Sequence, residues 1–102
     1  MVSEIQQNIF EQINGKELRF AKFKIMTEHE NKVHVRKGGK HLIIKYNESS
    51  DLYDLEQLKI NTKTFNVTKN NQLDSVFFDQ LQGIIEEFFS FEYVMERLGM
   101  LR

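Results

Sequence analysis

The 102-residue chain contains no cysteine, no proline and no tryptophan. The lack of cysteine excludes disulfides, thiolate nucleophiles and metal sites with cysteine ligands. It also favours an intracellular protein, because small secreted domains are usually disulfide-linked. Without proline the chain lacks the commonest marker of a linker, so we expect one α+β domain over residues 1–102.

Long apolar runs are also missing. No stretch approaches the roughly 20 residues of a membrane-spanning helix. The first seven residues, MVSEIQQ, lack the basic and apolar regions of a signal peptide. Hydrophobic residues make up 40% of the chain and charged residues 28%, as in soluble globular proteins. We therefore expect a soluble protein in the cytoplasm, without a membrane partner.

Charge is divided unevenly along the chain, although the net charge is only −1. Residues 1–15 hold two acids and no base, and residues 16–45 hold nine bases and three acids. Residues 46–102 hold five bases and ten acids. A basic half of this kind is typical of a surface that faces nucleic acid or a membrane. It can equally let the two halves attract each other within the fold or across a dimer.

The first third of the chain predicts a helix followed by a strand. Isoleucine at every fourth position predicts a helix over residues 3–14, with Ser3 as the N-cap and Gln6 completing a capping box. Alternation of apolar and polar residues then predicts a strand over residues 17–27, with a bulge at Ala21 where the alternation slips.

A β-hairpin is predicted over residues 32–46, because two alternating runs flank the pair Gly38-Gly39. In that register the pairs Val35–Leu42 and Val33–Ile44 share one apolar face. Cross-strand neighbours lie about 5 Å apart, so the other face is expected to be a compact basic stripe. Its side chains are His34, Arg36, His41, Ile43, Lys45 and Lys32.

The rest of the chain is expected to return as two strands, over 52–60 and 64–68, and then to form a helix over 73–89. The helical spacing comes from Phe77, Leu81, Ile84 and Phe88. Gly83 inside this helix predicts a close contact with another element. Residues 91–98 are expected to form a strand.

A short similarity between residues 9–13 and 84–88 suggests an internal repeat. Each segment ends a predicted helix and is followed by a break and a predicted strand. The pattern indicates two similar helix–strand units with a groove between them. The expected fold class is thus α+β, a mainly antiparallel sheet with two helices packed on it.

Four segments carry a resemblance to known proteins: HLIIKYN at 41–47, DLYDL at 51–55, VFFDQL at 76–81 and IIE at 84–86. Over residues 41–90 the chain resembles small uncharacterised proteins of bacteriophages and of viruses that infect archaea. In those proteins a strand hairpin with a Leu-Tyr-Asp step precedes a C-terminal helix with an Asp-Gln-Leu step. The resemblance implies an α+β fold and a viral or mobile-element origin, from which we expect a protein in the cytoplasm of an infected host cell. It implies no activity and no functional residues.

The sequence carries no recognisable catalytic, cofactor or metal pattern. Glu86 and Glu87 are adjacent on a predicted helix, so their side chains diverge by about 100° and cannot act as a convergent acid–base pair. His34 and His41 share a predicted face, but zinc needs three or four ligands and the surrounding bases repel a cation. We expect a protein that is not an enzyme and binds no cofactor.

Two functions are expected. The first is protein–protein interaction with a peptide, a partner chain or a second copy, in a groove or along a sheet edge. Its motive is the surplus of aromatic residues near the C-terminus; Phe78 and Phe89 fall off the predicted helical stripe and are expected to face outward. The expected contacts are Phe78, Phe89, Phe91 and Tyr93. The alternative is nucleic-acid binding by segment 16–45. Its expected contacts are Lys32, Arg36, Lys37, Lys40 and Lys45.

Overall fold

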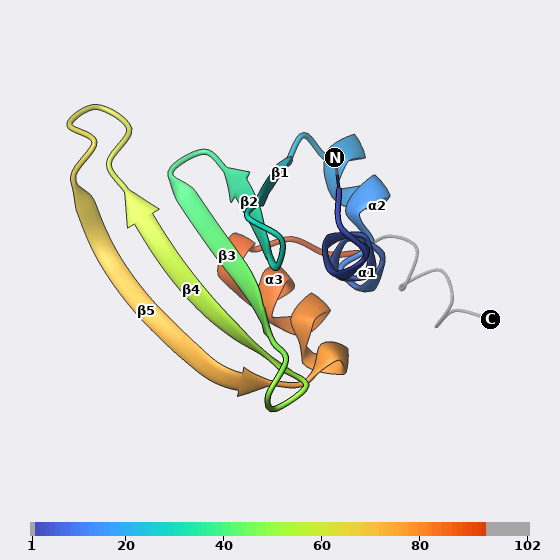
Figure 1. Ribbon diagram of the computed structural model, residues 1–102. Helices are drawn as coiled ribbons and strands as arrows, with labels where there is room; N and C mark the ends of the chain where they lie inside the picture. Colours follow the sequence, from blue (N-terminus) through green and yellow to red (C-terminus); the bar gives the residue numbers. More distant parts are fainter. Residues whose placement is uncertain (1, 94–102) are drawn as a thin grey trace.

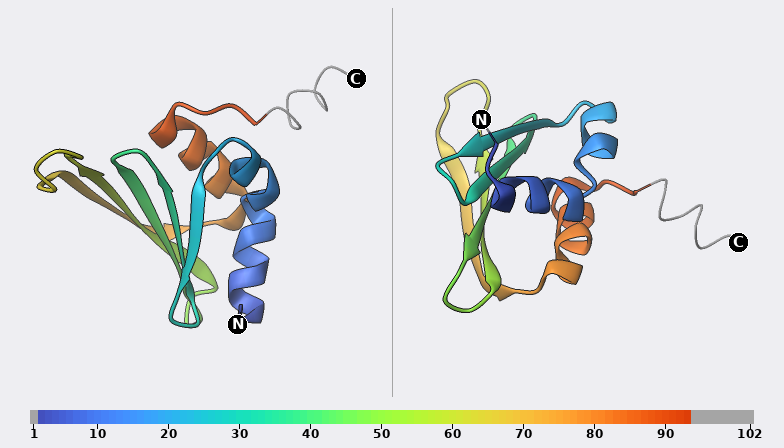
Figure 2. Two further views of the ribbon diagram at one scale, coloured as in Figure 1. Left: turned by 90° about the horizontal axis from the view of Figure 1, so that it is seen from above. Right: turned by 45° about the vertical axis from the view of Figure 1, so that its right-hand side comes forward.

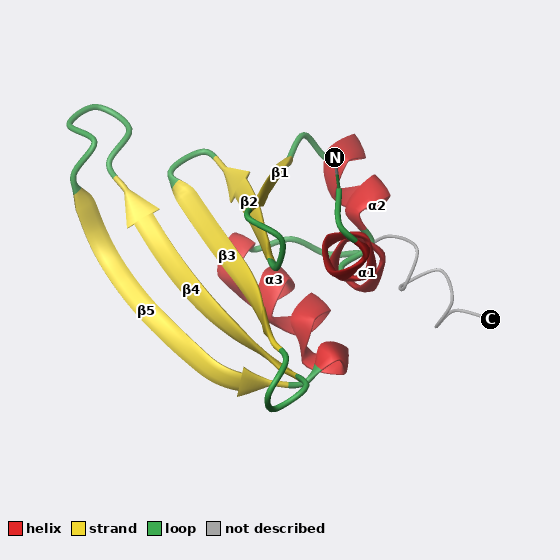
Figure 3. Cartoon of the chain, viewed as in Figure 1, coloured by secondary structure: helices red, strands yellow, loops and turns green. Residues whose placement is uncertain are grey.

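The computed structural model describes residues 2–93. Two helices precede five strands, and a short 3-10 helix and a third α-helix follow them (Figures 1 and 3). In chain order the elements are α1 (Glu4–Gln12), α2 (Gly15–Phe20), β1 (Lys24–Glu28), β2 (Lys32–Lys37), β3 (Lys40–Asn47), β4 (Leu52–Ile60), β5 (Val67–Val76), η1 (Phe78–Gln80) and α3 (Leu81–Phe89).

The five strands form one antiparallel sheet in which each strand pairs with the next along the chain, in the order β1-β2-β3-β4-β5. The predicted α+β class is confirmed, and so is the hairpin register, with Val35 opposite Leu42 and Val33 opposite Ile44. Gly38 takes a left-handed conformation in the turn, with φ of 61°. A side chain at Gly39 would collide with the Ile60 carbonyl oxygen of the neighbouring strand.

All three α-helices lie on the same side of the sheet, as the right-hand view of Figure 2 shows. We call this side the covered face and the other side the open face. Because side chains alternate along a strand, the buried valines, leucines and isoleucines of β2, β3 and β4 point to the covered face, whereas Ile43 points to the open face. On the covered face the buried residues form one core with the helices, which includes Ile9, Ile13, Leu18, Val33, Val35, Leu42, Ile44, Leu55, Leu81 and Ile85.

Helix α1 begins as predicted. Ser3 is its N-cap, and the Ser3 and Gln6 side chains form the reciprocal bonds of a capping box. The Gln6 side chain is also buried, and its amide group donates to three main-chain carbonyl oxygens of the β1–β2 turn region, those of Glu28, His29 and Lys32. One side chain therefore caps the helix and attaches it to the sheet.

The prediction of a strand over 17–27 is wrong in its first half. Asn14 takes a left-handed conformation and Gly15 starts α2, so the chain turns into a second short helix. The apparent alternation of Leu18 and Phe20 does not mark one face, because Leu18 is fully buried whereas Phe20 is exposed. The strand starts only at Lys24.

The predictions for residues 61–89 are wrong at several boundaries. Residues 61–66 form the β4–β5 loop, so the strand expected over 64–68 starts only at Val67, and β5 occupies the first residues of the expected 73–89 helix. The helix begins at Leu81, which moves its buried stripe to Leu81, Ile85 and Phe89. A side chain added at Gly83 would meet no atom within 4 Å, so the expected close contact is absent.

The internal repeat is also wrong. After α1 the chain enters α2 rather than a strand, and residues 91–93 after α3 are irregular. Residues 94–98 of the expected last strand lie outside the described residues. Tyr93 instead closes the fold: its hydroxyl donates to the main-chain oxygen of Ile13 at 2.8 Å, which ties the end of α3 to the end of α1.

Candidate functional site

Four lysines form a straight row across the sheet. Lys37 of β2 lies opposite Lys40 of β3, Lys40 lies opposite Lys59 of β4, and Lys59 lies opposite Lys69 of β5. Lys37 and Lys40 share the parity of the core valines and leucines of their strands, so the row runs along the covered face. With strands about 4.8 Å apart, the row is about 14 Å long. We call these four residues the lysine row.

The lysine row borders the aromatic side of the core. The Lys37 ammonium group lies 4.8 Å from the centre of the Phe23 ring and donates to the Ala21 carbonyl oxygen at 3.2 Å. The Lys40 ammonium group lies 6.0 Å from the centre of the Phe88 ring on α3. The stems of these lysines thus cover the edge of the core while their charges remain at the surface.

No acid balances the row. Among residues 2–93, no lysine of the row forms an ion pair. Like charges directly opposite one another on a sheet destabilise it. The row therefore sets four lysines in cross-strand register without an ion-pair partner among the described residues.

The row continues into a basic hairpin. Residues 57–73, which we call the arm, contain Lys59, Lys63 and Lys69 and no acidic residue. The arm carries its loop away from all the helices in every view of Figures 1 and 2. Residues 61–72 are exposed, so the side chains of the loop and of most of β5 are free for contacts.

Asn61 organises the loop at the tip of the arm. Its side-chain oxygen accepts from the main-chain nitrogens of Lys63 and Thr64. Its main-chain oxygen accepts from Phe65 at 2.7 Å, and its main-chain nitrogen donates to Asn66 at 2.9 Å. These bonds hold Phe65 at a φ of 61° with 79% of its surface exposed. A bulky residue with positive φ is a conformational outlier that its surroundings must enforce.

The open face is not the basic stripe that the sequence predicts. Lys32, Arg36 and Lys45 do lie there, and β1 adds Lys24 opposite Arg36. The neighbouring strands also add acids: Glu28 lies opposite Lys32, and Asp54 lies opposite Lys45. Glu56 lies opposite Ile43 on the same face. The prediction placed the six side chains of the hairpin on one face correctly, but it did not include the acids that β1 and β4 add to that face. Lys37 and Lys40 belong to the covered face.

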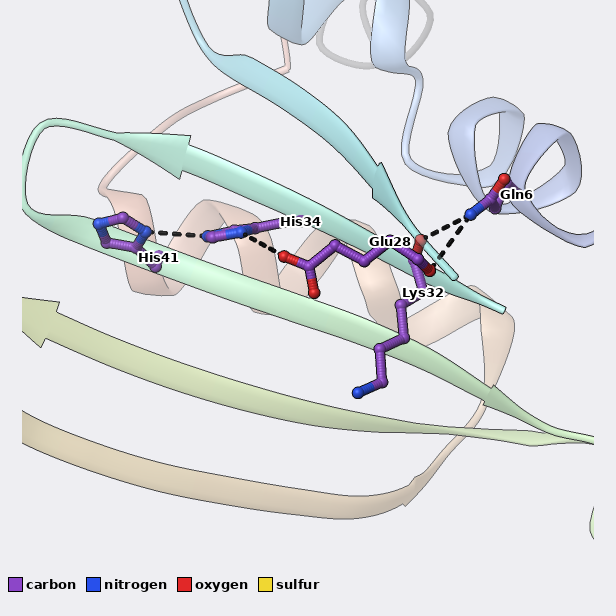
Figure 4. Close-up of polar contacts among 5 residues, drawn as sticks. All are labelled: Gln6, Glu28, Lys32, His34 and His41. Carbon is purple, nitrogen blue, oxygen red and sulfur yellow. Dashed lines mark hydrogen bonds and ion pairs between the residues drawn. The ribbon is translucent and has the colours of Figure 1, made fainter. Parts of the chain in front are cut away.

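A chain of three side chains crosses the open face (Figure 4). His34 Nδ1 lies 3.1 Å from Glu28 Oε1, and His34 Nε2 lies 2.9 Å from His41 Nδ1. A hydrogen bond between two ring nitrogens requires one nitrogen without a proton. Burial, followed by the charges of His34 and Arg36, lowers the pKa of His41 below the ordinary histidine value.

A polar pocket of about 650 Å³ opens between the start of α1 and the end of β3, lined among others by Ile5, Lys45 and Tyr46. The Tyr46 hydroxyl donates to Asp51, which together with partial burial raises the pKa of Tyr46 to about 12. The hydroxyl is therefore a proton donor at neutral pH rather than a base or nucleophile. In the part of the chain that the structure describes, no group of three or more His, Asp or Glu side chains could hold a metal ion.

Of the aromatic residues predicted to bind a partner, only Phe78 faces solvent, with 62% of its surface exposed. The expectation that Phe89 faces outward is wrong, because the later start of α3 turns it into the core, where its ring lies 5.0 Å from that of Phe23. Tyr93 is 2% exposed. Phe91 packs against the core, next to the rings of Phe23 and Tyr93.

Sequence reasoning missed Phe77, which is exposed beside Phe78, and missed Lys59 and Lys69. Lys59 follows from pairing β4 with β3 across the turn at 48–51, because Asn47 opposite Leu52 sets Lys40 opposite Lys59. The partner of Lys59 on β5 could not be found in this way, because it depends on a six-residue loop and on irregular pairing after Lys59.

Comparisons with protein families, with curated proteins and with solved structures gave no match for this chain. Within residues 2–93 no helix is both long enough and apolar enough to span a bilayer.

Proposed function

We propose that this protein binds nucleic acid through the lysine row and the arm, and that the phosphate backbone is the group that it contacts. The observation that carries the proposal is the row itself, four lysines in direct cross-strand register without an acid among them. Phosphates would relieve the repulsion within the row and release the counterions that surround a nucleic acid. The site lies on the other side of the sheet from most of the basic side chains expected from the sequence.

The distribution of acids supports this assignment in spite of the net charge of −1. The ten acids of residues 46–102 all lie outside the arm, either before residue 57 or after residue 73. Glu56 and Asp74 border the arm at its base, and Glu56 lies opposite Gln72. Acids farther from the arm than a Debye length, about 8 Å at physiological salt, are largely screened. The local charge of the arm is positive.

The test is the salt dependence of binding to a labelled 20-nucleotide oligo-dT, followed by fluorescence anisotropy. Four phosphate contacts on a single strand predict a slope of log K against log salt of about −3. The Lys59→Gln/Lys69→Gln variant removes two contacts and should lower the magnitude of the slope by about 1.4.

The matched control removes the same charge from the open face. Lys32→Gln/Lys45→Gln should leave the slope within about 0.3 of the unmodified protein, because these residues lie on the opposite face. Equal losses in the two double variants would mean that binding depends only on net charge, and the lysine row would not be the site. Absence of binding at low salt would end the proposal.

A second function, association with a polypeptide, is favoured by one observation. Phe77 and Phe78 are consecutive, both more than half exposed, and stand where β5 passes into η1. Burial of one phenylalanine contributes about 1.5–3 kcal/mol, so the pair could anchor a second copy of the chain.

Sedimentation over a range of concentrations tests this association. The unmodified protein is expected to associate as its concentration rises, and Phe77→Ser/Phe78→Ser to stay monomeric, whereas Phe20→Ser, which changes an exposed phenylalanine of α2, should behave as the unmodified protein. An unmodified protein that is monomeric at every concentration would remove self-association. A viral origin and a location in the host cytoplasm stay predictions from the resemblance over residues 41–90.

A further inference from the structure

We propose that the tip of the arm stacks an unpaired base on Phe65, so that the protein binds single-stranded nucleic acid in preference to duplex. This inference rests on the proposed function of the lysine row and specifies its ligand. Phe65 is the single aromatic residue of the arm, and it stands between Lys63 and Lys69 in the sequence. A lysine-lined surface that ends in an exposed aromatic ring has the two components of sites for single strands.

The hydrogen bonds of the loop hold Phe65 in its exposed position. Seven non-glycine residues of the described chain have a positive φ, and Phe65 is the only apolar one among them. The bonds around Asn61 hold the phenylalanine in that conformation, with its ring in solvent. The backbone strain at Phe65 and its exposed apolar surface both lower the stability of the protein, and the side chain gains no packing in the core in return.

The side chains around Phe65 fit bases better than lipid. Its neighbours in the loop are amides and hydroxyls that can bond base edges, namely Thr62, Thr64 and Asn66. A loop that enters a membrane presents several large apolar side chains together. Here the arm offers one exposed ring and Val67, surrounded by polar groups.

A duplex offers no free base face to the ring, because its bases are paired and stacked. Single strands offer one at every nucleotide, and stacking tolerates any base because each has a π-face. The lysine row would then follow the phosphates while Phe65 holds a base, which predicts binding with little sequence preference.

The experiment compares Phe65→Ala and Phe65→Trp with the unmodified protein on three probes: a 20-nucleotide oligo-dT, a duplex of the same length, and heparin, which has charge but no bases. Phe65→Ala should weaken oligo-dT binding by about tenfold, and Phe65→Trp should restore it. Neither change should alter heparin binding by more than twofold. Phe78→Ala, an exposed phenylalanine at the other end of β5, is the matched control and should leave all three probes unaffected.

Equal binding of oligo-dT by the unmodified protein and by Phe65→Ala would overturn the stacking of a base, while the proposed function would stand if the Lys59→Gln/Lys69→Gln variant still lost affinity. Tighter binding of the duplex than of the single strand would also overturn it. Binding of vesicles with anionic lipid that depends on Phe65, without binding of oligo-dT, would assign the ring to a membrane and overturn both proposals. Circular dichroism should give the same melting temperature for both Phe65 variants, because the side chain makes no core contact.

Discussion

The part of the molecule that the helices cover, which we call the body, differs from the arm in how its side chains are used. In the body, apolar side chains of three helices and four strands meet in one core, and no buried side-chain nitrogen or oxygen of residues 2–93 lacks a partner. In the arm, residues 61–72 are exposed, lysines face one another across strands, and an aromatic residue takes a strained backbone conformation. On β4 and β5, the residues near the helices pack in the core, whereas the residues toward the loop are partly or fully exposed and available for binding.

The largest change in the free energy of unfolding is expected from a substitution at Gln6, in the body. Gln6→Glu keeps the shape of the side chain but sets a carboxylate against main-chain oxygens where the amide now donates. An unpaired buried charge costs about 3–5 kcal/mol. Burial raises the folded-state pKa of the new carboxyl group, so the loss should be small at low pH and grow as pH rises above about 4.3. Urea unfolding at pH 4 and pH 7 measures it.

The matched control for this change is Gln7→Glu, one residue further along α1 on its exposed side. Its effect should stay within about 0.5 kcal/mol. Equal losses for the two variants would mean that Gln6 contributes only to the helix and does not attach it to the sheet.

A smaller effect of opposite sign is expected on α3. Gly83→Ala should stabilise the protein by about 1 kcal/mol, since alanine favours the helix and the added carbon meets no atom within 4 Å. The affinity for oligo-dT should not change. This result would show that the stability of the body can be altered without an effect on binding by the arm. A fall in the melting temperature would show that Gly83 has a contact that the structure lacks.

In the arm, removing one functional charge should stabilise the fold. Lys59 lies between Lys40 and Lys69, so Lys59→Gln relieves two like-charge contacts and should raise the free energy of unfolding by about 0.5 kcal/mol at low salt. The gain should disappear at 1 M salt, where the Debye length is about 3 Å. A loss of stability at low salt would mean that the row is not repulsive and would weaken the argument for an anion.

The smallest effect concerns His41 on the open face. Its folded-state pKa lies below the unfolded value of about 6.5, so its contribution to stability is complete above pH 6.5 and is lost as pH falls through the lower folded value. Melting temperatures measured between pH 5 and pH 8 should fall less steeply with acid for His41→Asn than for the unmodified protein. His29→Asn, a change at an exposed turn residue, should leave the slope as it is. Oligo-dT binding should show no matching pH dependence, because His41 lies on the open face and the lysine row on the covered face.

The sequence predicts well where structure is local. Ser3 and Gln6 define the start of α1, and Gly38-Gly39 fixes a register that the structure confirms pair by pair. It predicts poorly where the outcome depends on distant partners. Phe89 is buried because α3 starts at Leu81, which turns its ring toward the distant Phe23. The second role of Gln6 depends on carbonyls more than twenty residues away. The lysine row requires three strand registers at once, so no single segment reveals it.

The meander order of the sheet influences the order in which the parts of the molecule fold. Every strand finds its partner in the neighbouring stretch of chain, so each hairpin closes a short loop at little entropic cost. Within residues 2–93, two long-range hydrogen bonds join the α3 region to the end of α1: the Tyr93 hydroxyl donates to the Ile13 oxygen across 80 residues, and the Gln82 side chain donates to the Gln12 oxygen across 70. Local pairings form fast and distant ones slowly. We therefore expect the hairpins to form first and the docking of α3 onto α1 to come last, so the arm can be complete before the body closes.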